Sequence, residues 1–179
     1  MKNSNKNSTF VLWLTGLSGS GKTTIAQNLK NKLEQEIKNI HHLDGDEVRA
    51  KAKIPLGFTA ADRDKNIKLA IDLAKEYQQN NINIIASFIS PYTHHRNWGR
   101  KSLDNYMEIF IDSPLEICQQ RDPKGLYQKA LKDEIKNFTG ISDPYEKPLN
   151  PELHIQTHIA SIEKCVDQIY KHLKNNSWI

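Results

Sequence analysis

The sequence contains few cysteines and no long apolar run. Only Cys118 and Cys165 occur among its 179 residues, far apart and without the close spacing of metal ligands. This usage predicts a reduced, cytoplasmic protein and argues against a disulfide-stabilised secreted one. Because no apolar stretch reaches the roughly 18 residues that span a bilayer, we expect no membrane partner.

Other absences narrow the function and the domain organisation. The basic residues are scattered and the net charge is only +4, so we expect no nucleic-acid partner, which would need a clustered basic stripe. The Asn-Lys-x-Asp stretch with which GTPases read guanine does not occur, nor do internal repeats. Residues 1–8 are polar and lack the apolar core of a signal peptide. We therefore expect a flexible N-terminal tail over residues 1–8 and a single domain over residues 9–179.

Short segments that predict strands, some of them strongly apolar, alternate with amphipathic stripes along the rest of the chain. Runs that predict strands lie at residues 9–16, 39–46, 82–90, 106–114 and 152–157. Stripes that predict helices lie at residues 25–37, 63–79, 126–136 and 159–173. This alternation predicts an α/β fold, a three-layer sandwich around a mostly parallel five-stranded sheet. The second strand should end in an acidic turn, and residues 138–151, rich in proline, should form a long surface loop.

A glycine-rich segment follows the first predicted strand and opens the first predicted helix. The stretch GLSGSGKTT, residues 16–24, matches the pattern GxxxxGK[ST] in the required context. Glycines let backbone N–H groups turn toward an anion, and the helix N-terminus adds a positive dipole. We expect Lys22 to reach the β- and γ-phosphates of ATP and Thr23 to bind Mg²⁺. The residues assigned to ATP here are Gly16, Ser18, Gly19, Ser20, Gly21, Lys22, Thr23 and Thr24.

A second polar stretch, LDGDEVR at residues 43–49, follows the second predicted strand. In open α/β sheets, ligands bind at the carboxyl ends of the strands. Asp46 is a candidate catalytic residue that accepts a hydrogen bond from an attacking hydroxyl. Asp44 is a candidate to hold magnesium through water, and Arg49 to hold an anionic group. The stretch alone is equally compatible with an Asp-Gly turn and a surface ion pair.

The stretch LGFTAADRDKNI, residues 56–67, adds an aromatic ring and two polar side chains. Phe58 can stack on a base, and Arg63 and Asn66 lie three apart on one helical face. The alternative is a core phenylalanine next to a salt bridge at a helix start. Arg121 and Lys124 belong to the charged segment 121–140, which could close over ATP as a lid or could be a solvated helix.

The remaining candidate functional residues are one serine and four histidines. Ser90 ends a predicted strand, but no histidine is placed to activate it, so we favour a structural or contact role. The histidines form two adjacent pairs, His41–His42 and His94–His95. Adjacent residues do not share a face of a helix or strand, which predicts poor metal sites, and we assign these histidines no role.

Taken together, these stretches resemble the adenylylsulfate kinase family, whose members are also called APS kinases. The matching pieces run in family order from about residue 12 to residue 157: GLSGSGKTT, LDGDEVR, LGFTAADRDKNI, FISPY, RDPKGLY, EIKNFTGI and DPYEKPLNPEL. The resemblance implies a P-loop nucleotide-kinase fold, often as a homodimer. It also implies transfer of the γ-phosphate of ATP to the ribose 3′-hydroxyl of adenylyl sulfate.

The resemblance also assigns roles to individual residues. Asp46 would meet the 3′-hydroxyl, and Ser90 matches a serine described in the family as a phosphoserine intermediate. The residues assigned to the acceptor nucleotide are Asp46, Arg49, Phe58, Arg63, Asn66, Ile89, Ser90, Lys124 and Phe138. Among these, Phe58 and Phe138 would sandwich the base, and the cofactors would be ATP and Mg²⁺.

The chain departs from the family pattern at two places beside the expected acceptor pocket. Residues 50–53 read Ala-Lys-Ala-Lys where the family typically has His-Gly-Leu-Asn, and Lys68 and Leu69 replace two arginines. Because of these changes, two acceptor nucleotides stay open. The first is adenylyl sulfate, which would place the protein in sulfate assimilation. The alternative is cytidine diphosphoramidate, whose kinase serves capsule modification. A non-catalytic nucleotide-binding regulator is a more distant alternative, which an ADP-release assay separates from an enzyme.

Overall fold

The computed structural model of the chain describes residues 9–52 and 57–179, apart from the side chains of Asp46 and Ala50. The predicted tail over residues 1–8 therefore lies outside the described residues. Within them, no helix combines the length and apolarity that crossing a bilayer requires.

Five strands form one parallel sheet, as the alternating pattern predicts. They are β1 (Val11–Thr15), β2 (Ile40–Asp44), β3 (Asn83–Ser87), β4 (Tyr106–Asp112) and β5 (Leu153–Gln156). Their order is β2-β3-β1-β4-β5, and each neighbouring pair runs parallel. β1 lies in the centre with all five residues buried, because helices cover both faces of the sheet.

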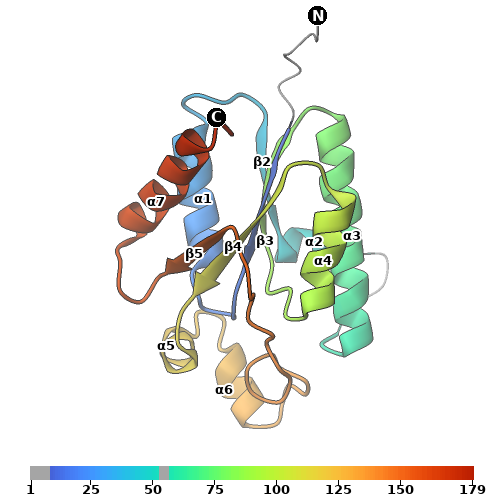
Figure 1. The fold of residues 1–179 in the computed structure, drawn as a ribbon. Helices are drawn as coiled ribbons and strands as arrows, with labels where there is room; N and C mark the ends of the chain where they lie inside the picture. The colour runs from blue at the N-terminus through green and yellow to red at the C-terminus, as the bar shows by residue number, and fades with distance from the viewer. Residues whose placement is uncertain (1–8, 53–56) are drawn as a thin grey trace, which may run out of the picture.

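The helices make the two outer layers of the sandwich (Figure 1). α1 (Lys22–Leu33) and α7 (Ile162–Asn175) pack together on one face. α2 (Gly45–Lys51), α3 (Ala60–Gln79) and α4 (Thr93–Ser102) cover the other face. Side chains of β1 alternate between the two cores: Leu12 and Leu14 pack on the α1 side, and Val11 and Trp13 on the α3 side.

Two short helices, α5 (Leu115–Arg121) and α6 (Leu126–Leu131), lie beyond the carboxyl ends of the strands (Figure 1). A small apolar cluster centred on Cys118, Tyr127 and Phe138 holds this region together. Residues 138–151 contain no helix or named strand, as predicted. The carboxyl ends of the strands, α5 and α6 thus face the same space at one end of the sheet.

Several predicted boundaries differ from the structure. The predicted acidic turn is the start of α2, and α4 and α5 were not predicted from the pattern. The helix expected over 126–136 ends at Leu131. The last helix begins at Ile162, because the Ser161 side chain accepts a hydrogen bond from the Lys164 N–H and caps it. Ile159, which the stripe included, lies outside the helix and is 70% exposed.

Candidate active site

The loop between β1 and α1 has positive φ angles at Gly16, Gly19 and Gly21, and at the first two a side chain would also collide with neighbouring backbone. Gly16 and Gly19 have φ angles of +155° and +73°. A Cβ at Gly16 would lie 2.2 Å from the carbonyl oxygen of Ile111, and one at Gly19 would lie 2.9 Å from that of Cys118. The loop therefore rests directly on β4 and α5. It leads into α1, whose twelve residues direct their N-terminal dipole at the same space.

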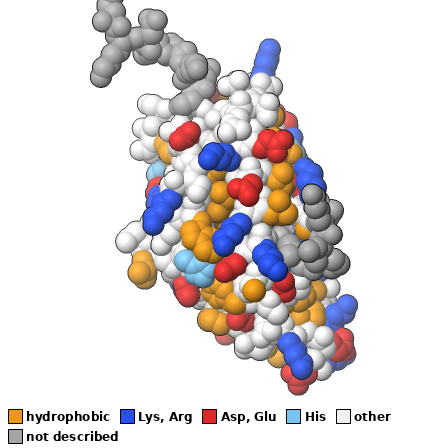
Figure 2. All heavy atoms as spheres, turned by 90° about the vertical axis from the view of Figure 1, so that its right-hand side faces the viewer, with side chains coloured by type: hydrophobic (Ala, Val, Ile, Leu, Met, Phe, Trp, Pro, Cys, Tyr) orange, Lys and Arg blue, Asp and Glu red, His pale blue; other side chains and the backbone are white. Residues whose placement is uncertain are grey.

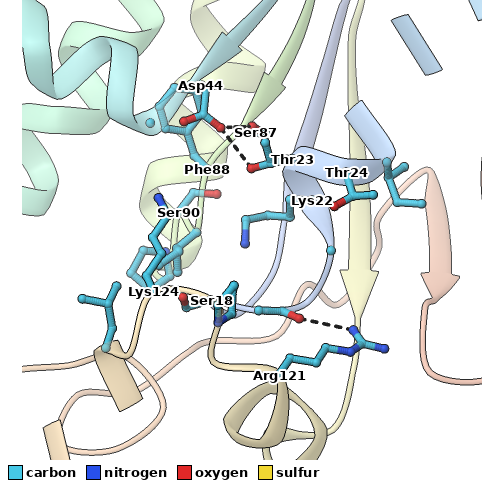
Figure 3. A pocket seen from close by; sticks show the side chains of 18 of the residues that line it. Ser18, Lys22, Thr23, Thr24, Asp44, Ser87, Phe88, Ser90, Arg121 and Lys124 are labelled. Carbon is cyan, nitrogen blue, oxygen red and sulfur yellow. Dashed lines mark hydrogen bonds between the residues drawn. The ribbon is translucent and has the colours of Figure 1, made fainter. Parts of the chain in front are cut away.

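Lys22 is a buried cation at the start of α1. Its side chain points into the cavity beside the loop (Figure 3). Its Nζ donates a hydrogen bond of 2.7 Å to the carbonyl oxygen of Leu17, within the same loop. Burial lowers the pKa of Lys22 from 10.5 to about 8, and nearby Cys118 and Asp44 oppose the decrease. The charged form thus lacks the stabilisation that water gives to an exposed lysine. A bound polyphosphate would supply the missing counter-charge.

A chain of hydrogen bonds connects the loop to β2 and β3. Thr23 Oγ1 and Ser87 Oγ each donate to Asp44 Oδ2 over 3.0 Å (Figure 3). His42 Nε2 lies 2.8 Å from Ser87 Oγ. Because Ser87 gives its single proton to Asp44, His42 donates to Ser87, and burial lowers the pKa of this histidine. The chain fixes the carboxylate of Asp44 beside the hydroxyl of Thr23.

Arg121 supports the loop from α5. Its Nη1 donates to the carbonyl oxygen of Gly19 over 3.2 Å, and its Nη2 donates to that of Thr157 over 3.0 Å. Thr157 Oγ1 in turn donates to the carbonyl oxygen of Ser20 over 2.7 Å. Tyr127 OH donates to the carbonyl oxygen of Ser18 over 2.9 Å. Three side chains from the C-terminal half thus bind carbonyl oxygens of the loop and fix its backbone.

A cavity of about 950 Å³ brings the ATP and acceptor candidates together. The predicted site residues that line it are Ser18, Gly19, Gly21, Lys22, Thr23, Thr24, Asp44, Arg49, Phe58, Arg63, Asn66, Ile89, Ser90, Arg121, Lys124 and Phe138. Gly16 and Ser20 lie in the loop but do not line the cavity, since Ser20 is fully buried. The side chain of Asp46 lies outside the described residues, so its role stays a prediction.

Arg63 joins α3 to the loop that follows α6. Its Nε donates to the Phe58 carbonyl oxygen over 3.0 Å, and its guanidinium also donates to Thr139 Oγ1 and to the Asn137 carbonyl oxygen. An ion pair of 3.7 Å connects Nε to Asp143 Oδ2. Arg63 is 7% exposed and lines the cavity. Arg63 therefore holds in place the wall of the cavity that lies opposite the phosphate-binding loop, and it also places a positive charge there.

Asn66 and the two phenylalanines complete that wall. The Oδ1 atom of Asn66 is buried and has no hydrogen-bond partner among the described residues, which marks it as a contact for a polar ligand. The ring centroids of Phe58 and Phe138 lie 6.2 Å apart at an angle of 59°. A base sandwiched between two rings needs them nearly parallel and about 7 Å apart. Phe58, the less buried ring, would have to turn to admit a base, so the sandwich stays a prediction.

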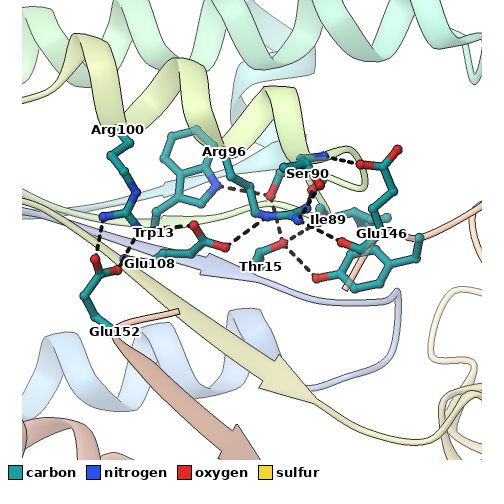
Figure 4. A network of polar contacts seen from close by, with 11 residues as sticks. Trp13, Thr15, Ile89, Ser90, Arg96, Arg100, Glu108, Glu146 and Glu152 are labelled. Atoms are coloured by element: carbon teal, nitrogen blue, oxygen red, sulfur yellow. Dashed lines mark hydrogen bonds and ion pairs between the residues drawn. The ribbon is translucent and has the colours of Figure 1, made fainter. Parts of the chain in front are cut away.

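The hydroxyl of Ser90 belongs to a buried network behind the cavity (Figure 4). Ser90 has a φ of +38° and is 1% exposed. Its Oγ accepts from Trp13 Nε1 over 3.1 Å and donates to Thr15 Oγ1 over 2.9 Å. Thr15 Oγ1 donates to the Ile89 carbonyl oxygen over 2.7 Å. Neither partner of Ser90 is a base, so this geometry favours the structural or contact role over the nucleophilic one.

Comparison with known proteins identifies the family. The family model for adenylylsulphate kinase matches residues 8–156. The chain belongs to the adenylylsulphate kinase family. A probable adenylyl-sulfate kinase from Pseudomonas aeruginosa is 51% identical over 90% of this chain and 76% of its own length. The adenylyl-sulfate kinase of Clostridium acetobutylicum is 47% identical over 93% of this chain and 84% of its own length.

A solved structure agrees with the predicted P-loop kinase fold. The APS kinase of Mycobacterium tuberculosis, in complex with AMPPNP and APS, has a TM-score of 0.88 and 37% identity. The match covers 93% of this chain and 98% of that one. The predicted fold class is therefore confirmed, and the resemblance read from the sequence motifs is correct.

The departures from the family pattern lie outside the cavity wherever the structure describes them. Lys68 is exposed and its ammonium lies 4.6 Å from the ring centroid of Trp98, and Leu69 packs against the core on the α3 side. Lys51 pairs with Glu47 on the surface. None of these described departures lines the cavity. Residue 53 and the side chain of Ala50 lie outside the described residues.

The sequence argument missed the residues that support the site from behind. These residues are His42, Ser87, Tyr127 and Thr157. Each forms its supporting hydrogen bond with a residue 43 or more positions away in the chain, so local patterns hold no signal for them. The premise that adjacent histidines cannot reach the same point does not hold for His94 and His95, whereas their expected weakness as a metal site stays a prediction. Both lie in the first turn of α4, and both rings reach the carboxylate of Asp64 in α3.

Proposed function

We propose that this protein transfers the γ-phosphate of ATP to the ribose 3′-hydroxyl of adenylyl sulfate and forms 3′-phosphoadenylyl sulfate. The observation that carries the proposal is a single cavity with a phosphate-binding loop on one wall and base- and anion-binding side chains on the other. Its volume of about 950 Å³ is large for one small ligand. Family membership and the relative bound to AMPPNP and APS support the same pair of substrates.

The loop would hold the phosphates of ATP in the transition state. Backbone N–H groups and the α1 dipole would stabilise the β- and γ-phosphates, and Lys22 would neutralise charge on the transferred group. Because Lys22 is already buried, its charge acts in a medium of low dielectric constant, where it is worth more than in water.

Thr23 and Asp44 offer oxygen atoms of the kind that Mg²⁺ prefers. Thr23 Oγ1 and Asp44 Oδ2 lie 3.0 Å apart beside the phosphate-binding loop. Thr23 would bind the ion directly, and Asp44 would hold it through a bound water. Magnesium supplies positive charge that offsets the charge of the phosphates. The chain from His42 through Ser87 keeps the Asp44 carboxylate oriented for this contact.

The opposite wall would orient the acceptor. Asn66 Oδ1 and Arg49 would hold the sugar and the anhydride, and Phe58 would stack on the adenine against Phe138. Asp46 follows β2 by two residues, so its backbone lies at the strand end where the reacting hydroxyl would sit. It would accept the hydroxyl proton during in-line attack on the γ-phosphorus. This route forms no phosphoserine at Ser90.

Three wider features belong to the same proposal. Segment 121–140 would act as a lid that places Arg121 beside ATP and Lys124 beside the acceptor nucleotide. The protein would work in the cytoplasm, where ATP is available and its two thiols stay reduced. It would associate as a homodimer, which sedimentation of the purified protein tests directly.

The decisive assay for the substrate is ADP release with ATP and magnesium, with adenylyl sulfate and cytidine diphosphoramidate offered in parallel. We expect turnover with adenylyl sulfate only, since the described departures from the family pattern lie outside the cavity. Turnover with the cytidine compound alone would refute the proposed acceptor and keep the proposed chemistry. Absence of turnover with both would favour a nucleotide-binding regulator. Asp46→Asn should lower kcat far more than it weakens ATP binding.

A further inference from the structure

Three side chains that could hold a metal ion converge between α3 and α4, outside the active-site cavity. Asp64 comes from the N-terminal part of α3, and His94 and His95 come from the first turn of α4. Asp64 Oδ1 lies 3.0 Å from His94 Nε2 and 2.8 Å from His95 Nε2. All three potential ligand atoms lie within 4.8 Å of one another. None of the three residues lines the cavity.

Neighbouring aromatic rings hold the two imidazoles in place. His94 stacks on Tyr92 with ring centroids 5.4 Å apart and meets Trp98 edge-on at 4.7 Å. His95 contacts the same two rings at 4.9 Å and 5.5 Å. Because rings wedged between neighbours have little freedom to lose, binding an ion here costs less conformational entropy than at mobile side chains.

Burial is graded across the three side chains. The side chain of His95 is fully buried, whereas those of Asp64 and His94 are 36% and 49% exposed. An ion could therefore enter from the solvent side and reach the buried ring last. The Nδ1 atom of His95 is buried without a hydrogen-bond partner among the described residues. When Nε2 binds an ion, the ring proton lies on Nδ1, which has no acceptor among the described residues, so this buried N–H reduces the affinity of the site.

Two imidazole nitrogens and one carboxylate oxygen are the donor set that suits Zn²⁺. In a tetrahedral zinc site with bonds of about 2.0–2.2 Å, the ligand atoms lie about 3.4 Å apart. The nitrogen–oxygen distances here are 2.8 Å and 3.0 Å. Both are shorter than that spacing by about half an ångström, and the two imidazole nitrogens lie within 4.8 Å of each other, so the partly exposed side chains of Asp64 and His94 adjust their positions when the ion binds.

We propose that Asp64, His94 and His95 form a zinc-binding site in which a water molecule is the fourth ligand. The ion joins the N-terminal part of α3 to the first turn of α4. Asp64 follows Arg63, which lines the cavity, so the ion also braces the helix segment that carries the acceptor wall. The proposal stands on its own geometry and does not depend on the identity of the acceptor nucleotide.

Zinc titration of the untagged, chelator-treated full-length protein tests the site. Competition with a chromophoric chelator should give one zinc ion per chain. His94→Ala and Asp64→Asn should each weaken binding by about tenfold or more. His154→Ala is the matched control, because His154 Nε2 also pairs with a carboxylate, that of Asp112, over 2.9 Å but belongs to no group of three potential ligands among the described residues. This control should bind zinc like the wild type.

A second measurement distinguishes loss of zinc binding from poor folding of the variants. Zinc should raise the thermal midpoint of the wild type and of the His154→Ala control, but not that of His94→Ala. Cobalt(II) in place of zinc should give the visible absorption of a tetrahedral site in the wild type, and this band should disappear in His94→Ala. Zinc binding that is absent from the wild type, or equally strong in wild type and His94→Ala, overturns the proposal.

Discussion

Replacing Lys22 with methionine separates what this lysine does for catalysis from what it does to stability. Lys22 is 8% exposed, and burial lowers its pKa from 10.5 to about 8. Each pKa unit is worth about 1.36 kcal/mol, so the charged ammonium costs the folded protein about 3 kcal/mol. Methionine has a similar shape and carries no charge. The variant should therefore lose turnover by about 10²–10³-fold or more and be free of this cost.

The sign of the pH effect follows from which state binds the proton. Between pH 8 and pH 10.5 the unfolded chain keeps the Lys22 proton and the folded protein has released it, so wild-type stability gains with rising pH from this group. The cost is fully present below pH 8 and is lost toward pH 10.5. The variant has no such group. The unfolding free energy of Lys22→Met minus that of the wild type should fall by about 2.5 kcal/mol between pH 7 and pH 10.

The measurement is urea unfolding of both proteins without nucleotide at pH 7 and pH 10. The variant also loses the hydrogen bond to the Leu17 carbonyl, worth about 1.5–3 kcal/mol, which shifts its unfolding free energy at any single pH. The informative quantity is therefore how the difference in unfolding free energy between the two proteins changes with pH. Lys75→Met, an exposed position of α3, is the control and should show no comparable change. A pH-independent difference at Lys22 would refute the desolvation argument.

Three further substitutions test other parts of the site. Phe58→Ala should raise the KM for adenylyl sulfate about tenfold through lost stacking, and an equal rise in the KM for ATP would argue against that role. Gly19→Ala should weaken ATP binding in calorimetry at least about tenfold, because its Cβ would meet the Cys118 carbonyl oxygen at 2.9 Å; unchanged affinity would contradict the loop geometry. His42→Leu should raise the magnesium concentration for half-maximal rate about tenfold, since it removes the hydrogen bond that holds Ser87 in place. An unaltered dependence of the rate on magnesium would show that His42 does not contribute to magnesium binding.

The strands and the phosphate-binding loop were predictable because their signals are local. Mostly apolar runs predicted the inner strands β3, β1 and β4, since residues buried on both faces of a parallel sheet are mainly apolar. The edge strands β2 and β5 are only partly buried and include polar residues, so their signal was weaker. α4 gave no such signal. It packs through charge: Arg96 pairs with Glu108 over 3.0 Å, and Arg100 pairs with Glu152 (Figure 4). A helix whose buried face carries arginine does not show an apolar stripe.

The sequence motifs predicted which residues gather around the cavity, but they predicted less of how the side chains are oriented there. The motif residues with described side chains gather around one cavity, apart from Gly16 and Ser20. The inward direction of the Ser90 hydroxyl depends on Trp13, which is 77 residues away in the chain. The convergence of His94 and His95 on Asp64 depends on how α3 packs on α4. Such contacts arise from tertiary packing and have no counterpart in local spacing.

The central claim is direct transfer between two nucleotides bound in one cavity, and the position of a labelled phosphate tests it most directly. Protein incubated with ATP labelled in the γ-phosphate, magnesium and adenylyl sulfate should place the label on the ribose 3′-oxygen of the product. Lys22→Met should give no labelled product under the same conditions. Label on the protein itself, or on a position other than the 3′-oxygen, would contradict the account.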